Sequence, residues 1–310
     1  MTGFLSVELP GETASMNNFS EIAGAHLVAD RVRPSRKWSA CAIRRAYHSQ
    51  DPGMPGDPGV PPARELVNSN AFGFNTTVMD YDDRLESFGS GQALTYTSGF
   101  RRERFTIQTD GTYRSDRTPL LSGMIGRRNQ DGSSTMRDKN GTVRSFGTDG
   151  WLRSITDRTG NTVTIIRTGA QIQQIIQPGG RALTFQYAGG GISQITDPLG
   201  RTVNYTYEAP TGGYAVPRLR TATNPAGGVT TYTYAGPYNI ATITDARGIT
   251  YLTNTYLSGT NLPLDHAVAT QTMADGSVTR FDYEYVGLGS ATVLTVKRAE
   301  ADPSASASDA

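Results

Sequence analysis

The chain has 310 residues, of which 36% are hydrophobic, and it is rich in glycine (35) and proline (16). This composition does not suit a thick helical core and favours many short strands joined by tight turns. A formal net charge of +1 excludes a global electrostatic attraction to nucleic acid, and a single cysteine excludes an intramolecular disulfide or a cluster of metal-binding thiols.

The first 45 residues show no clear hydrophobic periodicity, and their second half is basic, with no acidic residue between Asp30 and Asp51. A basic arm for nucleic acid or a membrane surface would need an aromatic or helical face to organise these charges, and none is recognisable. We therefore predict that residues 1–45 form a poorly ordered basic leader. The stretch up to Glu12 does not have the apolar run of a signal peptide, and no apolar run in the chain is long enough to span a bilayer.

Residues 51–62 are dense in proline and glycine, which favours an extended or turning linker. Short runs of alternating apolar and polar residues begin after it, with Asp110-Gly111 and Asp131-Gly132 between such runs. Asp-Gly is a strong signal for a two-residue hairpin turn. We predict that residues 46–134 form a β-rich antiparallel segment that precedes the repeats.

Residues 135–298 are repetitive. A turn tetrad that begins with Asp, Asn or Gln and ends with Gly recurs about every 20 residues, which indicates an array of one supersecondary unit. The first side chain accepts hydrogen bonds from the backbone of its own turn, and glycine closes the turn at low steric cost. The predicted structural turn residues are Asp138 and Gly141, Asp157 and Gly160, Asp197 and Gly200, Asn224 and Gly227, and Asp245 and Gly248.

Each repeat also contains two short strands. The first alternates apolar and polar residues, as in Leu183, Phe185 and Tyr187, so its apolar side chains share one face. In the second strand apolar residues are three apart, as in Ile172 and Ile175, and this step suggests a β-bulge. A single hairpin is marginally stable in water, whereas stacked units join their apolar faces into one continuous sheet.

These repeats resemble the YD repeats of the Rhs family, which includes bacterial polymorphic toxins, the cocoon component of Tc insecticidal toxins, and teneurins. Residues 157–164 (DRTGNTVT) and 197–207 (DPLGRTVNYTY) are close to the repeat consensus, and the resemblance covers roughly residues 46–290. It implies that the repeats wind into a long β-sheet that spirals into a hollow shell. We accordingly predict an all-β fold of repetitive antiparallel β-hairpins that form a curved, spiralling sheet, the open arc of a β-shell.

The resemblance implies a non-catalytic structural segment of a secreted or cell-surface protein, part of a shell that encapsulates or presents a toxin effector in intercellular competition. Its partners would be further YD repeats or an effector supplied by flanking sequence. The closing core region of toxin members is not recognisable before Ala310, and residues 299–310 are a Ser/Ala/Asp-rich tail that we predict to be disordered. Two alternatives stay open: a cell-surface adhesion or carbohydrate-binding module, and a degenerate gene fragment without independent function.

No catalytic, cofactor or metal site is predicted. Asp157 and Asp197 could pair as the two acids of a glycosidase, but the equivalent slot elsewhere holds an amide, Asn224, so we interpret the position as structural. The three histidines are scattered, and Cys41 has no partner motif. The glycines at 189–191 lie between strands and not before a helix, so they do not form a phosphate-binding loop.

Tyrosines recur at strand positions of the repeats and are candidates for a sugar-binding platform, because aromatic faces stack on carbohydrate. Packing between neighbouring strands explains their alternation directly, and we favour that interpretation. Glycan binding stays a minority hypothesis, carried by Tyr187, Tyr205, Tyr207, Tyr232 and Tyr234.

Overall fold

The computed structural model describes residues 5–9, 12–16, 25–30, 43–48, 70–73, 76–78, 80–88, 91–98, 101–115, 123–209, 216–236, 239–258, 268–288 and 291–301. Every regular element within these ranges is a strand, so the predicted all-β class is confirmed. The strands before the main sheet are β1 (Leu5–Leu9), β2 (Glu12–Met16), β3 (Ala25–Asp30), β4 (Ile43–His48) and β5 (Thr76–Val78).

Strands β6 to β25 form one antiparallel sheet in which each strand pairs with its neighbours in chain order. The sheet begins with β6 (Arg84–Phe88), β7 (Ala93–Ser98), β8 (Arg101–Ile107), β9 (Tyr113–Arg114), β10 (Ile125–Arg128), β11 (Ser134–Arg137), β12 (Val143–Phe146) and β13 (Leu152–Thr156). It continues with β14 (Thr162–Thr168), β15 (Gln171–Ile176), β16 (Ala182–Ala188), β17 (Gly191–Thr196), β18 (Thr202–Glu208) and β19 (Arg218–Thr223). It ends with β20 (Val229–Ala235), β21 (Asn239–Thr244), β22 (Thr250–Tyr256), β23 (Val268–Met273), β24 (Val278–Leu288) and β25 (Ala291–Ala301).

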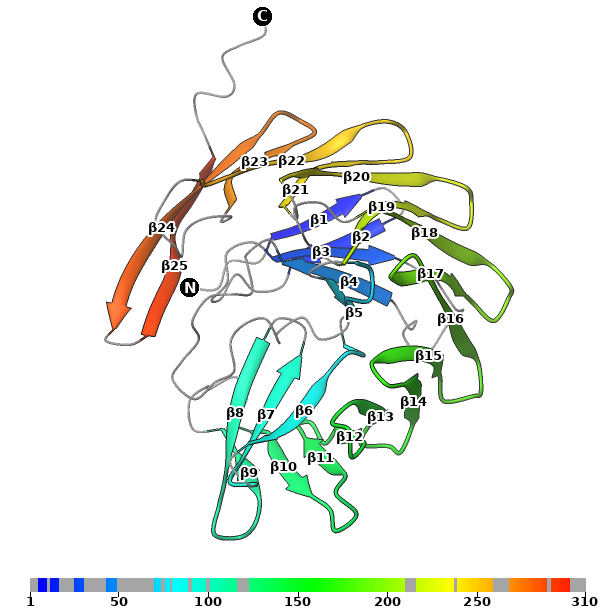
Figure 1. Ribbon diagram of the computed structural model, residues 1–310, viewed down its shortest axis with the longest axis vertical. Helices are drawn as coiled ribbons and strands as arrows, with labels where there is room; N and C mark the ends of the chain where they lie inside the picture. Colours follow the sequence, from blue (N-terminus) through cyan, green and yellow to red (C-terminus); the bar gives the residue numbers. More distant parts are fainter. Residues whose placement is uncertain are drawn as a thin grey trace, which may run out of the picture.

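The main sheet is a curved, open arc. Figure 1 shows its strands following one another around the molecule, with β24 and β25 projecting at one end. No ladder between β25 and β6 joins the two ends within the described ranges. The predicted curved sheet of repetitive hairpins is therefore confirmed.

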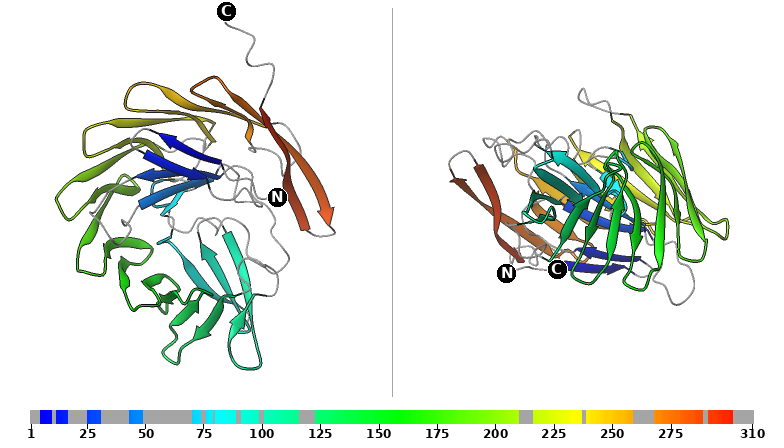
Figure 2. Two further views of the ribbon diagram at one scale, coloured as in Figure 1. Left: turned by 180° about the vertical axis from the view of Figure 1, so that it is seen from behind. Right: turned by 90° about the horizontal axis from the view of Figure 1, so that it is seen from below.

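The inside of the arc is occupied by the chain's own N-terminal strands. Strand β4 pairs with β3 and β5 in a small separate sheet, and the views in Figures 1 and 2 place this sheet on the concave side of the main one. The hydrogen bond from Arg45 of β4 to Tyr232 of β20 shows that the two sheets are in direct contact. The segment before the repeats thus contributes to the core of the arc.

Bulges occur at regular places in the repeats. In the pairing of β14 with β15, Ile166 lies opposite Gln174 and Arg167 opposite Ile172, so Gln173 is an extra residue. The pairings of β16 with β17, β18 with β19 and β20 with β21 shift in the same way. The bulge predicted from the three-residue step is therefore confirmed. A bulge increases the local twist and bends its strand, which contributes to the curvature of the sheet.

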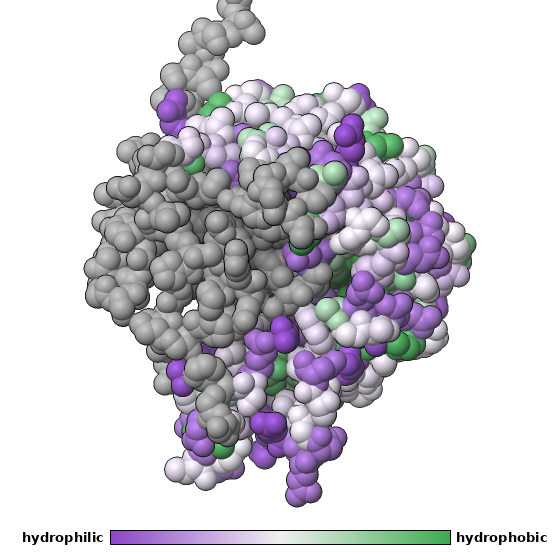
Figure 3. Space-filling view, viewed as in Figure 1, coloured by the Kyte–Doolittle hydropathy of each residue, from purple (hydrophilic) through white to green (hydrophobic). Residues whose placement is uncertain are grey.

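The two faces of the sheet differ as the alternation predicted. Side chains such as Ile165, Ile175 and Ile195 are buried on the concave side, where they form part of one continuous core. On the convex side threonine hydroxyls of neighbouring strands bond to each other, as between Thr206 and Thr221 at 2.6 Å. Most of the described surface in Figure 3 is hydrophilic, with apolar residues scattered singly.

The beginning of the main sheet, at residues 83–85, is hydrogen-bonded to residues 150–152 at the beginning of β13. The Leu85 N–H donates to the Gly150 carbonyl (2.8 Å), the Leu152 N–H donates to the Asp83 carbonyl (3.1 Å), and Arg84 forms an isolated antiparallel bridge with Trp151. We call this pairing of residues 83–85 with residues 150–152 the clasp. It closes β6 to β13 into a tight ring, at the narrow end of the arc.

The ring is filled by its own side chains. Tyr96 packs edge-on against Phe105 and Phe146, with ring centroids 6.5 and 6.2 Å apart. Met136 and Leu152 are also fully buried in the same core. The sequence predicted an antiparallel meander here, and the structure adds that the meander closes on itself.

Two predicted boundaries fall within strands. Residue 45, the predicted end of the leader, lies in β4, and residue 299, the predicted start of the tail, lies in β25. The basic run at residues 31–37, the linker at 51–62 and the tail beyond residue 301 lie outside the described ranges.

Candidate functional site

The predicted turn residues all lie in turns between strands. In each tetrad the glycine N–H donates to the carbonyl of the first residue, at distances from 2.9 to 3.1 Å. All five glycines have positive φ angles, from 77° at Gly200 to 89° at Gly160. The first side chain then accepts from the backbone: Asp157 Oδ1 accepts from the N–H groups of Thr159 and Asn161, at 2.8 and 2.9 Å.

These bonds favour the ionised form of Asp157 and Asp197. Burial acts to raise the pKa of Asp157, but the hydrogen bonds from Asn161 and Thr159 outweigh it and lower the pKa to about 2. The pKa of Asp197 is lowered as well: burial opposes the shift, and the bonds from Arg201 and Leu199 produce it. Both groups are thus engaged by their own turns, and neither holds a proton for general acid catalysis at neutral pH.

Replacing Gly160 with valine is expected to lower the free energy of unfolding by about 1 to 2 kcal/mol. A Cβ at this position meets no atom within 4 Å, so the loss comes from the backbone conformation at φ 89° and not from a clash. The measurement is urea denaturation of the purified chain. Gly160→Asn is the control, since asparagine tolerates the left-handed region and should lose less. Equal stability of the valine variant and the parent would contradict the assigned role of the turn.

Tyrosine hydroxyls join each repeat to the preceding one. At each bulge the ladder to the following strand stops, which leaves one backbone carbonyl without a ladder partner. The tyrosine of the next strand fills this place: Tyr187 donates to the carbonyl of Ile172 (3.1 Å) and Tyr207 to that of Ile192 (2.6 Å). Tyr234 and Tyr256 make the same bond to Leu219 and Ile240, at 2.7 and 2.6 Å. Burial raises the pKa of these four hydroxyls, so they stay protonated and continue to donate.

Removing one such hydroxyl, with Tyr207→Phe, is expected to lower the free energy of unfolding by about 1 to 3 kcal/mol, because the buried carbonyl of Ile192 loses its donor. Denaturant midpoints of the variant and the parent measure the effect. Tyr207→Ala should cost more, since it also removes the ring. A Phe variant as stable as the parent would show that water replaces the hydroxyl at no cost.

The five tyrosines considered for glycan binding do not form an exposed platform. Tyr205 and Tyr232 are 4% and 3% exposed, within the core of the arc. Tyr187, Tyr207 and Tyr234 are half-buried, and their hydroxyls make the inter-repeat bonds. All five therefore face the packed inside of the sheet.

Arg45 lies between the aromatic rings of the inner face. Its guanidinium carbon is 5.6, 5.2 and 5.3 Å from the ring centroids of Phe72, Tyr205 and Tyr232, and it donates to the Tyr232 hydroxyl at 2.8 Å. Phe72 packs on Tyr205 with centroids 4.9 Å apart. A cation held on several aromatic faces in a desolvated site is strongly attracted. Arg45 and Phe72 therefore anchor the N-terminal segment to the repeats.

Arg167 is a second anchor, and it takes the place of a tyrosine. Its Nε donates to the carbonyl of Leu152 (3.3 Å), which is the bulge carbonyl that a tyrosine would fill. The guanidinium also donates to the carbonyls of Tyr81 and Ala170 and forms a buried ion pair with Asp82 at 2.9 Å. Asp82 in turn accepts from the Val78 N–H at 2.8 Å.

Trp151 packs against two guanidinium groups at the clasp. The guanidinium carbons of Arg84 and Arg167 are 5.1 and 4.9 Å from its ring. A Cβ at the preceding residue, Gly150, would lie 2.5 Å from the Leu85 carbonyl oxygen, so this close approach requires glycine. Asp83, the residue directly before β6, is also buried. Its Oδ2 accepts a hydrogen bond from the Tyr96 hydroxyl at 2.5 Å.

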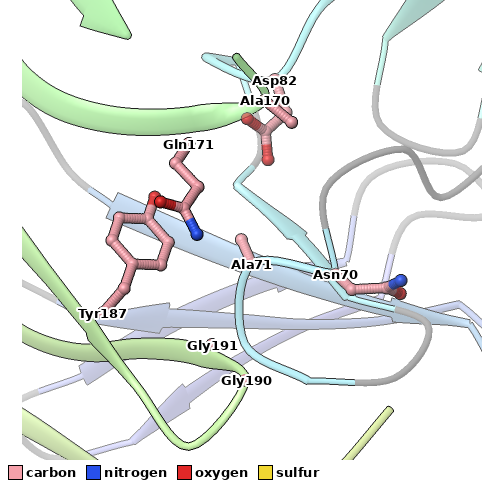
Figure 4. Close-up of a pocket in the computed structure, with 8 residues that line it drawn as sticks. All are labelled: Asn70, Ala71, Asp82, Ala170, Gln171, Tyr187, Gly190 and Gly191. Carbon is pink, nitrogen blue, oxygen red and sulfur yellow. The ribbon is translucent and has the colours of Figure 1, made fainter. Parts of the chain in front are cut away.

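A small cavity lies where the N-terminal segment meets β15 to β17. Figure 4 shows the side chains of Asp82, Gln171 and Tyr187 around it, with the backbone of residues 70–71, 170 and 190–191. Its volume of about 40 Å³ has room for one or two water molecules and is too small for a sugar ring. The described residues contain no group of three or more His, Cys, Asp or Glu side chains placed to hold a metal ion. They also contain no helix of the length and apolarity needed to cross a membrane.

Sequence reasoning missed Arg45, Asp82, Asp83 and Trp151, whose partners are remote in the chain. A signal for Arg167 exists in the sequence. Tyrosines 187, 207 and 234 each lie 15 residues after the carbonyl that they bond, and Arg167 lies 15 residues after Leu152. Alignment of the repeats on this spacing would show the substitution.

No protein-family model matches the chain, and no curated protein matches it either.

Proposed function

We propose that this chain is a non-catalytic structural segment of a secreted or cell-surface YD-repeat protein of the Rhs type, an arc of a β-shell that encapsulates or presents a toxin effector. The observation that carries the proposal is the continuous antiparallel sheet of repeats, in which the hydroxyls of Tyr187, Tyr207, Tyr234 and Tyr256 bond to the bulge carbonyl of the strand before them. Stability in such an array adds up over neighbouring units, which suits a wall of extendable length.

The hydrogen bonds that polar side chains make to the chain's own backbone support a structural role for this protein. Turn carboxylates such as Asp157 accept hydrogen bonds from their own backbone, and the tyrosine hydroxyls bond carbonyls. The buried charges of Arg45 and Arg167 serve to fix the N-terminal segment inside the arc. These side chains thus build the sheet or hold the N-terminal segment in it.

The adhesion alternative would need exposed aromatic rings. The five tyrosines that suggested it lie on the packed inner face, so no observation favours glycan binding at those positions.

The test uses the natural gene. Genomic DNA on both sides of this reading frame is sequenced, and the whole frame is expressed, cleaved by limited proteolysis and analysed by size exclusion. We expect further in-frame repeats and an effector that stays with the repeat fragment after cleavage. The variant Ile175→Asp, which puts a charge in the core, should release the effector. Flanking sequence without repeats or effector, or binding of the purified chain on a glycan array, would contradict the proposal.

A further inference from the structure

Asp83 is a buried carboxyl at the clasp, and its two oxygens have different surroundings. Oδ2 accepts from the Tyr96 hydroxyl at 2.5 Å and lies 3.5 Å from Arg144 Nε. Oδ1 is buried and has no hydrogen-bond partner within the described part of the chain. The backbone carbonyl of the same residue accepts from Leu152, so this carboxyl lies directly at the pairing that closes the ring.

The charged groups around Asp83 only partly compensate for its burial. Arg144 of β12 is shared with Asp138, whose Oδ2 lies 3.6 Å from it, and Asp80 adds a second negative charge from the preceding loop. Desolvation by burial is the largest influence and raises the pKa of Asp83 to about 6, against the lowering effects of Ser98, Tyr96 and Arg144. The pKa of Tyr96 is raised by burial as well, so its hydroxyl stays a donor.

We propose that the clasp is a proton-operated closure: when Asp83 takes up a proton, the pairing of residues 83–85 with residues 150–152 tightens and the narrow ring becomes harder to open. The reason is that a neutral carboxyl needs no counter-charge in a dry site, and its proton can serve as a donor. When the clasp opens, water solvates the carboxyl and its ordinary acidity returns.

The direction of the pH effect follows from the raised pKa. Between the ordinary value of 3.8 and about 6, the closed form binds more protons at Asp83 than the open form does. The proton-linked contribution to closure is therefore fully present below about pH 3.8, falls as the pH rises towards about 6, and is lost above it. The pKa values of the turn carboxylates Asp157, Asp197 and Asp245 are lowered, so these groups act in the opposite direction and lose their protons at more acidic pH than Asp83 does.

The experiment is hydrogen exchange of the Leu85 and Leu152 amides in the full chain, corrected for intrinsic exchange rates. Between about pH 7.5 and about pH 5, a pKa difference of this size makes protection increase about tenfold. Asp83→Asn, a neutral mimic of the protonated carboxyl, should show strong protection that does not change with pH. The amide of Gly248, which donates to the Asp245 carbonyl in the turn between β21 and β22, serves as the internal control because it is remote from the clasp.

The variants separate the clasp from other titrations. Both Asp83→Asn and the parent keep the three histidines of the chain, so any contribution of the histidines is the same in the two proteins. A second variant, Tyr96→Phe, removes the hydrogen bond that favours the ionised carboxyl and should move the midpoint to higher pH. Protection of Leu85 and Leu152 that is the same at both pH values in the parent, or that still changes in Asp83→Asn, would overturn the proposal.

Discussion

Replacing Arg167 with methionine is expected to lower the free energy of unfolding by about 3 to 5 kcal/mol, because the carboxylate of Asp82 is then left buried without its counter-charge. The side chains of Arg167 and Asp82 are 0% and 2% exposed, so water does not screen the pair. The same variant removes donors from the carbonyls of Leu152 and Ala170 and a cation from the Trp151 ring. Urea denaturation followed by tryptophan fluorescence measures the loss.

The repeat pattern offers a matched rescue of this variant. Arg167→Tyr combined with Asp82→Asn restores the tyrosine that other repeats have at this place and removes the buried charge. We expect the double variant to regain most of the stability, because replacing a buried ion pair as a whole is often neutral. A methionine variant that loses less than about 1 kcal/mol would show that the site admits water.

Replacing Arg45 with alanine is expected to lower the free energy of unfolding by about 3 kcal/mol and to detach the N-terminal segment from the arc. The loss combines the attraction to the rings of Phe72, Tyr205 and Tyr232, each worth up to about 2 kcal/mol when desolvated, with the bond to the Tyr232 hydroxyl. Limited proteolysis should then cut residues 70–83 faster than in the parent.

Two controls accompany the Arg45 variant. Arg45→Lys keeps the charge but loses the planar group that stacks on the rings, so it should recover only part of the stability. Arg181→Ala removes an exposed arginine and should change the stability by no more than about 0.5 kcal/mol. If alanine at 45 and alanine at 181 had the same effect, Arg45 would not be an anchor.

The elements that the sequence predicted are those with local causes. The turns at Asp157 and Asp197 follow from the tetrads, since their bonds join residues no more than four apart. The bulge at Gln173 follows from the spacing of Ile172 and Ile175. Alternation predicted one apolar and one polar face for each strand, and the repetition of the pattern predicted the single sheet.

The clasp and the two arginine anchors could not be predicted in this way. Arg45 and Tyr232 are 187 residues apart, and no local pattern shows which remote strand an arginine will meet. Alternation places tyrosines on one face of a strand but does not say whether that face is covered. Tyr205 and Tyr232 therefore fitted a sugar platform on sequence grounds, whereas in the structure both rings are buried, with Arg45 of β4 packed against them.

The bonds between tyrosine hydroxyls and bulge carbonyls run in one direction along the chain. A bulge carbonyl such as that of Ile192 stays without its donor until the side chain that bonds it, here Tyr207 15 residues further on, has been synthesised. A ribosome adds about 5 to 20 residues per second, so one repeat of about 20 residues emerges every 1 to 4 seconds, roughly. Hairpin formation is far faster than that. The sheet can therefore assemble vectorially during translation, with each new repeat completing the hydrogen bonds of the one before it.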